Sequence, residues 1–118
     1  MELKVKLYLE ENGEKFMGIG VLWLLQKIEE KKSLRAAAKD LEISYTKAYN
    51  MITNLEKCLN QQILIRQKGG QSRSGAVLTD FAIDFMKKYD TFQAQCKDLL
   101  KEPFERFKLD IYAHNIKI

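Results

Sequence analysis

Residues 33–59, SLRAAAKDLEISYTKAYNMITNLEKCL, decide the fold that we expect for this chain. Ser33 and Ser44 are residues of the type favoured at helix N-caps, so each predicts the start of a helix. The first helix is expected from Leu34 to Leu41, and the second from Ser44 to about Leu59. Two capped helices joined by a brief turn are typical of a helix-turn-helix unit.

The second of these helices has two different faces. One face is an apolar stripe, and the opposite face of its first two turns is polar. A recognition helix needs this division, because one side docks on the domain while the other reaches base edges in DNA. The stripe consists of Ala48, Ile52, Leu55 and Leu59. The polar residues are Ser44, Tyr45, Thr46, Lys47 and Asn50.

Individual roles follow from the chemistry of these side chains. Asn50 is the best candidate for a bidentate contact with an adenine edge, and Lys47 can reach a guanine or a phosphate. We expect Tyr45 to stack on the sugar-phosphate backbone and donate its hydroxyl to a phosphate. Tyr49 either does the same or fills the edge of the core. The alternative is a helical hairpin of a small bundle, with a solvated polar face that does not contact DNA.

Three further residues complete the predicted set on this side of the domain. Arg35 falls in the first turn after Ser33, where the helix N-terminus favours an anion. It is either a clamp for the DNA backbone or an ordinary solvated arginine. Ser33 and Arg66 are also expected to contact DNA.

The net charge of +4 is concentrated in one segment. Between Ile43 and Gly75 five residues are basic and one is acidic, whereas the rest of the chain carries 15 of each. A local basic excess attracts a polyanion, which makes nucleic acid the first partner to consider.

Part of this basic segment is expected to form a wing. Short strands are predicted at 63–66 and 76–78, joined by the glycine-rich residues 67–75. Lys68 and Arg73 in that loop can contact phosphates or the minor groove. The loop does not match G-x-x-x-x-G-K-[ST], so a nucleotide-binding loop is not indicated.

The flanking segments complete an ordered series of elements. Alternation from Leu3 to Leu9 predicts a strand that turns at Asn12-Gly13 and returns through residues 15–17. A helix is expected from about Ile19, and Thr79 caps a long final helix that reaches about Lys101 and is stopped by Pro103. We therefore predict a mainly α winged helix-turn-helix domain with a small β component over residues 1–102. Residues 103–118 are expected to be a C-terminal tail.

Composition excludes several other classes of protein. Two cysteines and one histidine are too few for a zinc finger, no residues form a catalytic set, and we predict neither enzyme activity nor a cofactor. The N-terminus lacks a signal-peptide hydrophobic block and the longest apolar run is too short to span a membrane, so we expect a cytoplasmic protein.

The first and final helices carry more apolar surface than so small a core can cover. We expect this surface to pair two copies of the chain in a homodimer, because large apolar patches are rarely left in water. The alternative is that the C-terminal tail folds back over it. The predicted interface residues are Trp23, Phe81, Phe85, Tyr89 and Phe92.

A series of short marks runs from Gly18 to Tyr89: Gly18-x-Gly20, Leu24-Leu25-x-x-Ile28, Ser33-Leu-x-x-Ala37-Ala38, Ile43-Ser-Tyr-x-x-Ala48-Tyr49, Gly69-Gly70, Gly75-Ala-x-Leu-Thr79 and Tyr89. In their order and spacing these marks resemble the N-terminal DNA-binding domain of ModE-type, molybdate-responsive regulators. Residues 33–79 are also similar to LysR-type regulators, which share the Ser-Leu-x-x-Ala-Ala and Leu-Thr marks. The Ser-Tyr pair and the two wing glycines favour ModE.

This resemblance implies a homodimer that reads a palindromic operator in double-stranded DNA, with the N-terminal hairpin and the terminal helix helping to pair the copies. Two departures stand out. Tyr49 occupies a position where the family usually has tryptophan, and the sequence to Ile118 leaves no room for molybdate-binding domains. We therefore expect a transcription regulator without a molybdate site. The alternative is a winged-helix module for protein assembly that does not bind DNA.

Overall fold

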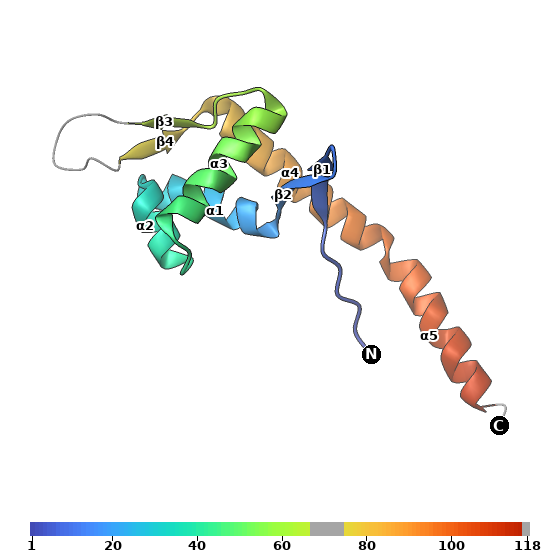
Figure 1. Cartoon of the computed structure of the whole chain (residues 1–118). Coiled ribbons are helices and arrows are strands. Elements are labelled where there is room, and N and C mark those ends of the chain that lie inside the picture. The colour runs from blue at the N-terminus through green and yellow to red at the C-terminus, as the bar shows by residue number, and fades with distance from the viewer. Residues whose placement is uncertain (67–74, 117–118) are drawn as a thin grey trace.

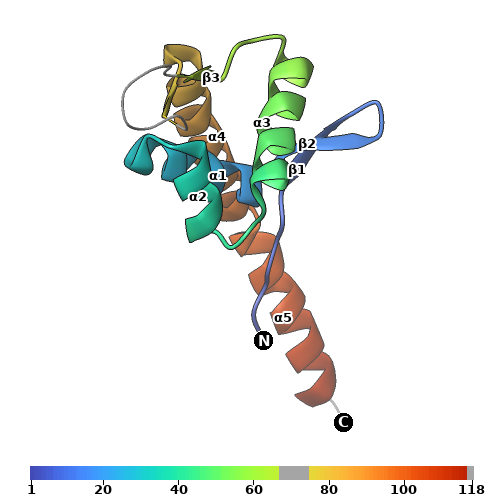
Figure 2. The same cartoon turned by 60° about the vertical axis from the view of Figure 1, so that its left-hand side comes forward.

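The computed structural model describes residues 1–66 and 75–116. It confirms a mainly helical fold with two small β-hairpins (Figure 1). In chain order the elements are β1 (Tyr8–Glu11), β2 (Glu14–Gly18), α1 (Ile19–Lys31), α2 (Leu34–Asp40), α3 (Tyr45–Leu59), β3 (Leu64–Arg66), β4 (Ala76–Leu78), α4 (Asp80–Leu99) and α5 (Lys101–Ile116). The β3–β4 hairpin lies at one end of the molecule and α5 at the other (Figures 1 and 2).

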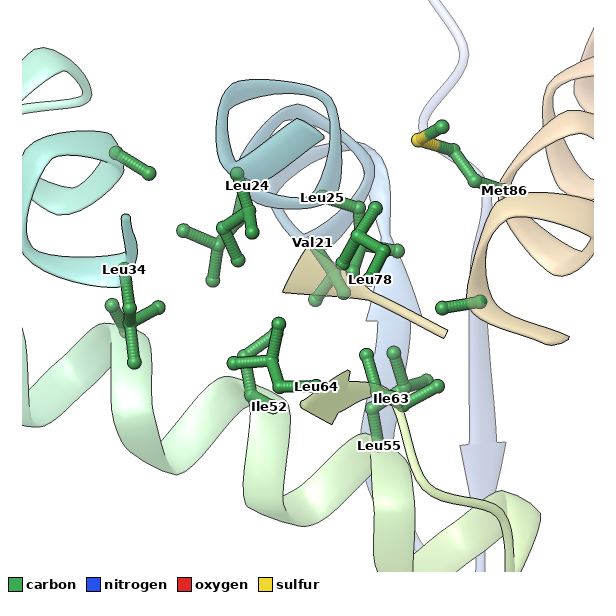
Figure 3. Packing of buried hydrophobic residues seen from close by; sticks show 14 of the residues in the cluster. Val21, Leu24, Leu25, Leu34, Ile52, Leu55, Ile63, Leu64, Leu78 and Met86 are labelled. Atoms are coloured by element: carbon green, nitrogen blue, oxygen red, sulfur yellow. The ribbon is translucent and has the colours of Figure 1, made fainter. Parts of the chain in front are cut away.

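Helix α1 is the centre of the core. It contacts β2, α2, α3, β4 and α4, and Leu24, Leu25 and Ile28 are completely buried. In Figure 3 leucines of α1 face Ile52 and Leu55 of α3. The apolar stripe predicted for α3 is therefore the face that docks on the domain.

Small residues bring α2 close to its neighbours. Ala37 and Ala38 are 0% and 2% exposed, and Leu34 beside them is 1% exposed. Side chains this small let a crossing helix approach the α2 backbone closely. Helix α2 contacts both α1 and α3, so these three helices form one packed unit.

The three predicted N-caps are present. The Ser33 hydroxyl accepts a hydrogen bond from the Ala36 amide at 3.1 Å, and Ser44 accepts one from the Lys47 amide at 3.0 Å. Thr79 caps α4 by accepting from the Ala82 amide at 3.1 Å. Each cap satisfies a backbone donor that the first helical turn leaves without an intrahelical partner.

The base of the wing is tied to the helical core. β3 pairs antiparallel with β4, with Leu64 opposite Leu78. The Ala76 amide donates to the Lys32 carbonyl at 3.0 Å, and the Thr79 amide donates to the Ile63 carbonyl at 2.9 Å. These bonds fix the two strands relative to the start of α2 and the start of α4.

The N-terminal strand is shorter than predicted. Only Tyr8–Glu11 pairs with β2, and Tyr8 lies opposite Gly18, where β2 ends and α1 begins. Within the described part of the chain, no strand lies beside the residues before Tyr8. Residues 1–6 run instead beside the junction of α4 and α5, where Leu100 and Phe104 help to line an open groove.

The helix capped by Thr79 ends close to the predicted Lys101, but the prediction that Pro103 stops it is wrong. Helix α4 ends at Leu99, and α5 follows immediately with Pro103 in its first turn. A proline is tolerated there because a first-turn amide has no intrahelical acceptor. The Phe104 amide already donates to the Leu100 carbonyl at 3.1 Å. Residues 103–116 are thus helical, and they extend away from the body without folding back over it (Figures 1 and 2).

Within residues 1–66 and 75–116, no helix has the length and apolar character needed to cross a membrane.

The central position of α1 generates a stability prediction. Replacing Leu25, which is 0% exposed, by alanine removes buried methyl groups and leaves a cavity. We expect the free energy of unfolding to fall by about 2–5 kcal/mol, measured by urea denaturation. The control is Leu109→Ala on α5, where the side chain is 65% exposed. A loss of similar size in both variants would contradict the packing described here.

The cap of α3 generates a second prediction. Ser44→Ala leaves the Lys47 amide without its acceptor and should lower the free energy of unfolding by about 1 kcal/mol. Ser44→Asp should retain the stability, because an aspartate also caps and its charge is favourable at a helix N-terminus. Urea denaturation of both variants checks this. Equal losses would show that the hydroxyl stabilises something other than the helix start.

Candidate nucleic-acid interface

The first two turns of α3 present a polar surface to solvent. Thr46, Lys47 and Asn50 are exposed, whereas Ala48 between them is 0% exposed. The cause is the packing of the apolar stripe, because a helix that buries one face must turn the opposite face outward. Three of the residues predicted to reach DNA therefore share one accessible side of this helix.

Beside this surface lies a shallow depression that sequence reasoning missed in part. It is lined by Ser44, Thr46, Lys47 and Asn50 from the predicted set, and also by Glu14, Met51 and Asn54. The Asn54 side-chain amide donates to the Lys15 carbonyl at 3.2 Å, which ties α3 to β2. Asn54 follows Asn50 by one helical turn, so helical spacing could have identified it. Glu14 gives no such signal, because its proximity depends on how the hairpin packs.

On the other side of α3 two tyrosines contact two arginines. The Arg35 guanidinium lies over the Tyr45 ring at 4.7 Å, and the Arg66 guanidinium lies over the Tyr49 ring at 5.2 Å. Arg66 also donates a hydrogen bond from Nη1 to the Tyr45 hydroxyl at 3.1 Å. The two tyrosine rings are 6.4 Å apart. Residues from α2, α3 and β3 are thereby brought together.

The electrostatic state of Arg66 follows from this arrangement. Its pKa is raised above the ordinary arginine value, chiefly because the Tyr45 hydroxyl accepts its hydrogen bond. The shift does not change its charge, because an arginine is protonated at any physiological pH.

The remaining predicted DNA contacts are placed as follows. Ser33 is half-buried and caps α2. Arg35 is exposed in the first turn of α2, and Arg66 is exposed at the end of β3. Lys68 and Arg73 lie outside the described residues.

The residues predicted for the dimer interface fall into two groups. Trp23, Phe81 and Phe92 are 52%, 36% and 45% exposed. Phe85 packs against the core with its ring 6.2 Å from that of Phe81. Tyr89 is only 4% exposed, and its hydroxyl donates to the Leu7 carbonyl at 2.9 Å. The chain itself thus covers Tyr89. Trp23, Phe81 and Phe92 remain as the exposed part of the predicted interface.

The segment that carries the predicted DNA contacts matches a known protein family. Residues 21–82 match the bacterial regulatory helix-turn-helix proteins of the lysR family. The matched range spans α1 to the start of α4 and so contains the whole unit that carries the predicted contacts.

Two curated relatives are ModE proteins. The chain is 30% identical over 70 residues to the transcriptional regulator ModE of Haemophilus influenzae, which is 59% of this chain and 28% of that protein. It is 28% identical over 83 residues to the molybdenum transport protein ModE of Azotobacter vinelandii, which is 70% of this chain and 31% of that protein. The chain thus spans less than a third of the length of either relative.

Solved structures share the fold. The CbnR DNA-binding domain in complex with DNA has a TM-score of 0.58 at 20% identity, and the match covers 76% of this chain and 98% of that one. The BenM DNA-binding domain in complex with benA site 1 DNA has a TM-score of 0.55 at 22% identity, with 75% and 94% covered. The chain belongs to the lysR family of bacterial regulatory helix-turn-helix proteins, and its fold is that of a LysR/ModE-type DNA-binding domain.

Proposed function

We propose that this protein binds double-stranded DNA in a sequence-specific manner, as a homodimeric transcriptional regulator. The observation that carries the proposal is the exposed polar face of α3, formed by Thr46, Lys47 and Asn50 at the start of the second helix of a helix-turn-helix unit. The N-terminal residues of such a helix contact base edges when it lies in the major groove.

The charges around α3 support the proposal. Among residues 1–66 and 75–116, none of the ion pairs includes Arg35, Lys47 or Arg66. By contrast, Lys27 and Lys31 on α1 both pair with Asp40. Cations that no carboxylate neutralises are available to phosphates, and their binding releases counterions from DNA.

The relatives add to this support. The CbnR and BenM domains that share the fold were solved with DNA bound, and the Haemophilus influenzae ModE is a transcriptional regulator. Molybdenum recognition is not carried over, because the chain matches less than a third of either ModE relative. We also propose a cytoplasmic protein without enzyme activity, because the matched family is one of regulatory helix-turn-helix proteins.

The proposed homodimer rests on exposed aromatic side chains. Trp23 on α1 and Phe92 on α4 are about half exposed, and Phe81 is exposed at the start of α4. A second copy would remove these rings from water, which is the usual reason for large apolar side chains to gather at interfaces. A two-fold dimer would also place two recognition helices about 34 Å apart, so that both halves of a palindrome are read.

A matched pair of variants on α3 tests the readout. Asn50→Ala should weaken binding to the cognate site by about 1–3 kcal/mol and relax the preference at one base position. Lys47→Ala should weaken binding to all duplexes alike if the lysine contacts a phosphate, and make the log-log salt slope shallower by about 0.9. Equilibrium binding to randomised duplexes at several salt concentrations measures both.

The outcomes separate the alternatives. A uniform loss for Asn50→Ala would assign that residue to the DNA backbone and pass the base contact to Thr46 or Tyr45. A wild-type protein whose affinity for duplex is absent or independent of salt would contradict the proposed function and favour a protein-assembly module.

Charge substitutions test the dimer. We expect sedimentation at micromolar concentration to show a dimer for the wild type, and Trp23→Glu or Phe92→Glu to shift it towards the monomer, because a buried unpaired carboxylate is costly. Leu109→Glu is the control, since Leu109 is 65% exposed on α5, outside the predicted interface. A monomeric wild type, or a dimer that tolerates both charges, would show that the predicted interface is wrong.

A further inference from the structure

Four side chains beside the recognition helix form a continuous series, which we call the arginine–tyrosine chain: Arg35, Tyr45, Tyr49 and Arg66. Each is in contact with the next through a ring or a hydroxyl group. The two arginines come from α2 and β3, and both tyrosines come from the first two turns of α3. The arginine–tyrosine chain therefore links α2, α3 and β3 on one side of the domain.

The hydrogen bond in this chain has a defined direction. A guanidinium can only donate, so the Tyr45 oxygen accepts from Arg66 at 3.1 Å. The hydroxyl hydrogen of Tyr45 is then left to donate to another acceptor. A phosphate oxygen that approaches Arg66 is an acceptor of the required kind.

The groups in contact with the positively charged Arg66 guanidinium are a neutral ring and a neutral hydroxyl. No ion pair within the described ranges includes Arg66. Glu56 and Arg66 line a second depression beside α3, but the Glu56 carboxylate accepts from the amides of Ile63 at 2.9 Å and Leu64 at 3.4 Å. A tyrosine ring and a hydroxyl orient a guanidinium without neutralising it.

Arg66 lies at a point where the orientation of its guanidinium affects both β3 and the start of α3. Arg66 is the last residue of β3 and is followed in the sequence by residues 67–75, the predicted wing loop. Tyr45 is the first residue of α3. The hydrogen bond between them therefore sets the strand that enters the wing against the start of the recognition helix.

We propose that Tyr45 and Tyr49 are positioning residues, which hold the Arg66 guanidinium in the orientation that receives a DNA phosphate. The proposal rests on the DNA binding proposed above. An arginine that is already oriented loses less side-chain freedom on binding, so its contact with the phosphate strengthens the complex more.

Tyr45→Phe is the sharpest test, because it removes the hydroxyl and keeps the ring beneath Arg35. We expect the dissociation constant for duplex DNA to rise about fivefold, which is about 1 kcal/mol, the usual net contribution of one hydrogen bond. The salt slope should stay unchanged, because Arg66 still neutralises its phosphate. Arg66→Ala should instead make the slope shallower by about 0.9.

A double-mutant cycle separates positioning from direct contact. In the Arg66→Ala background, Tyr45→Phe should weaken binding less than it does in the wild type, because the hydroxyl has no guanidinium to orient and only its own contact with the phosphate is lost. Tyr49→Leu should weaken binding only when Arg66 is present. Tyr112→Phe on α5, where the ring is 47% exposed, is the matched control and should bind like the wild type.

A measurement on the free protein keeps this inference distinct from the proposed function. Nitrogen-15 relaxation of the Arg66 Nε group should show a more mobile guanidinium in Tyr45→Phe than in the wild type. Unchanged mobility, unchanged affinity, or an undiminished effect of Tyr45→Phe in the Arg66→Ala background would each overturn the proposal. If the wild type shows no salt-dependent affinity for duplex, the proposed function fails and the assignment of a phosphate to Arg66 fails with it, while relaxation still reports whether Tyr45 orients the arginine.

Discussion

The burial of one narrow stripe on α3 is the constraint on which the interface depends. Ala48, Ile52 and Leu55 are between 0% and 3% exposed, and Ile52 and Leu55 face the leucines of the central helix α1 (Figure 3). A helix held along such a stripe cannot rotate without exposing apolar surface, at a cost of about 25 cal/mol for each Å². The rotation of α3 is therefore fixed, and Lys47 and Asn50 must face outward.

The β3–β4 hairpin depends on the same core through backbone hydrogen bonds. Ile63 is 0% exposed, and its carbonyl accepts from the Thr79 amide. The Thr79 hydroxyl in turn donates to the Gln62 carbonyl at 2.7 Å while it caps α4. One threonine thus joins the start of β3 to the start of α4. Because β3 is only three residues long, fixing its beginning also fixes Arg66 at its end.

Sequence reasoning located the elements whose signals are local. The caps at Ser33, Ser44 and Thr79 fixed three helix starts, because a cap is a contact between residues three positions apart. It failed where the outcome depends on distant segments. The alternation at residues 3–7 is that of a strand, but a strand also needs a partner, and β2 has already ended at Gly18. A proline breaks the interior of a helix but is tolerated in its first turn. The sequence around Pro103 does not show where a new helix begins, so its position in the first turn of α5 could not be predicted.

The same limit explains which parts of the interface could be predicted. Helical spacing identifies the face on which Tyr45 and Tyr49 lie, but it cannot identify which cation reaches them. Their partner Arg66 is 21 residues from Tyr45, and the distance closes only when β3 docks beside α3. Neither of the two roles considered for Tyr49 describes it alone, since its ring is 44% exposed and also faces a guanidinium. A side chain of this kind is available to DNA and already engaged by the protein, and only the folded arrangement of three elements reveals that combination.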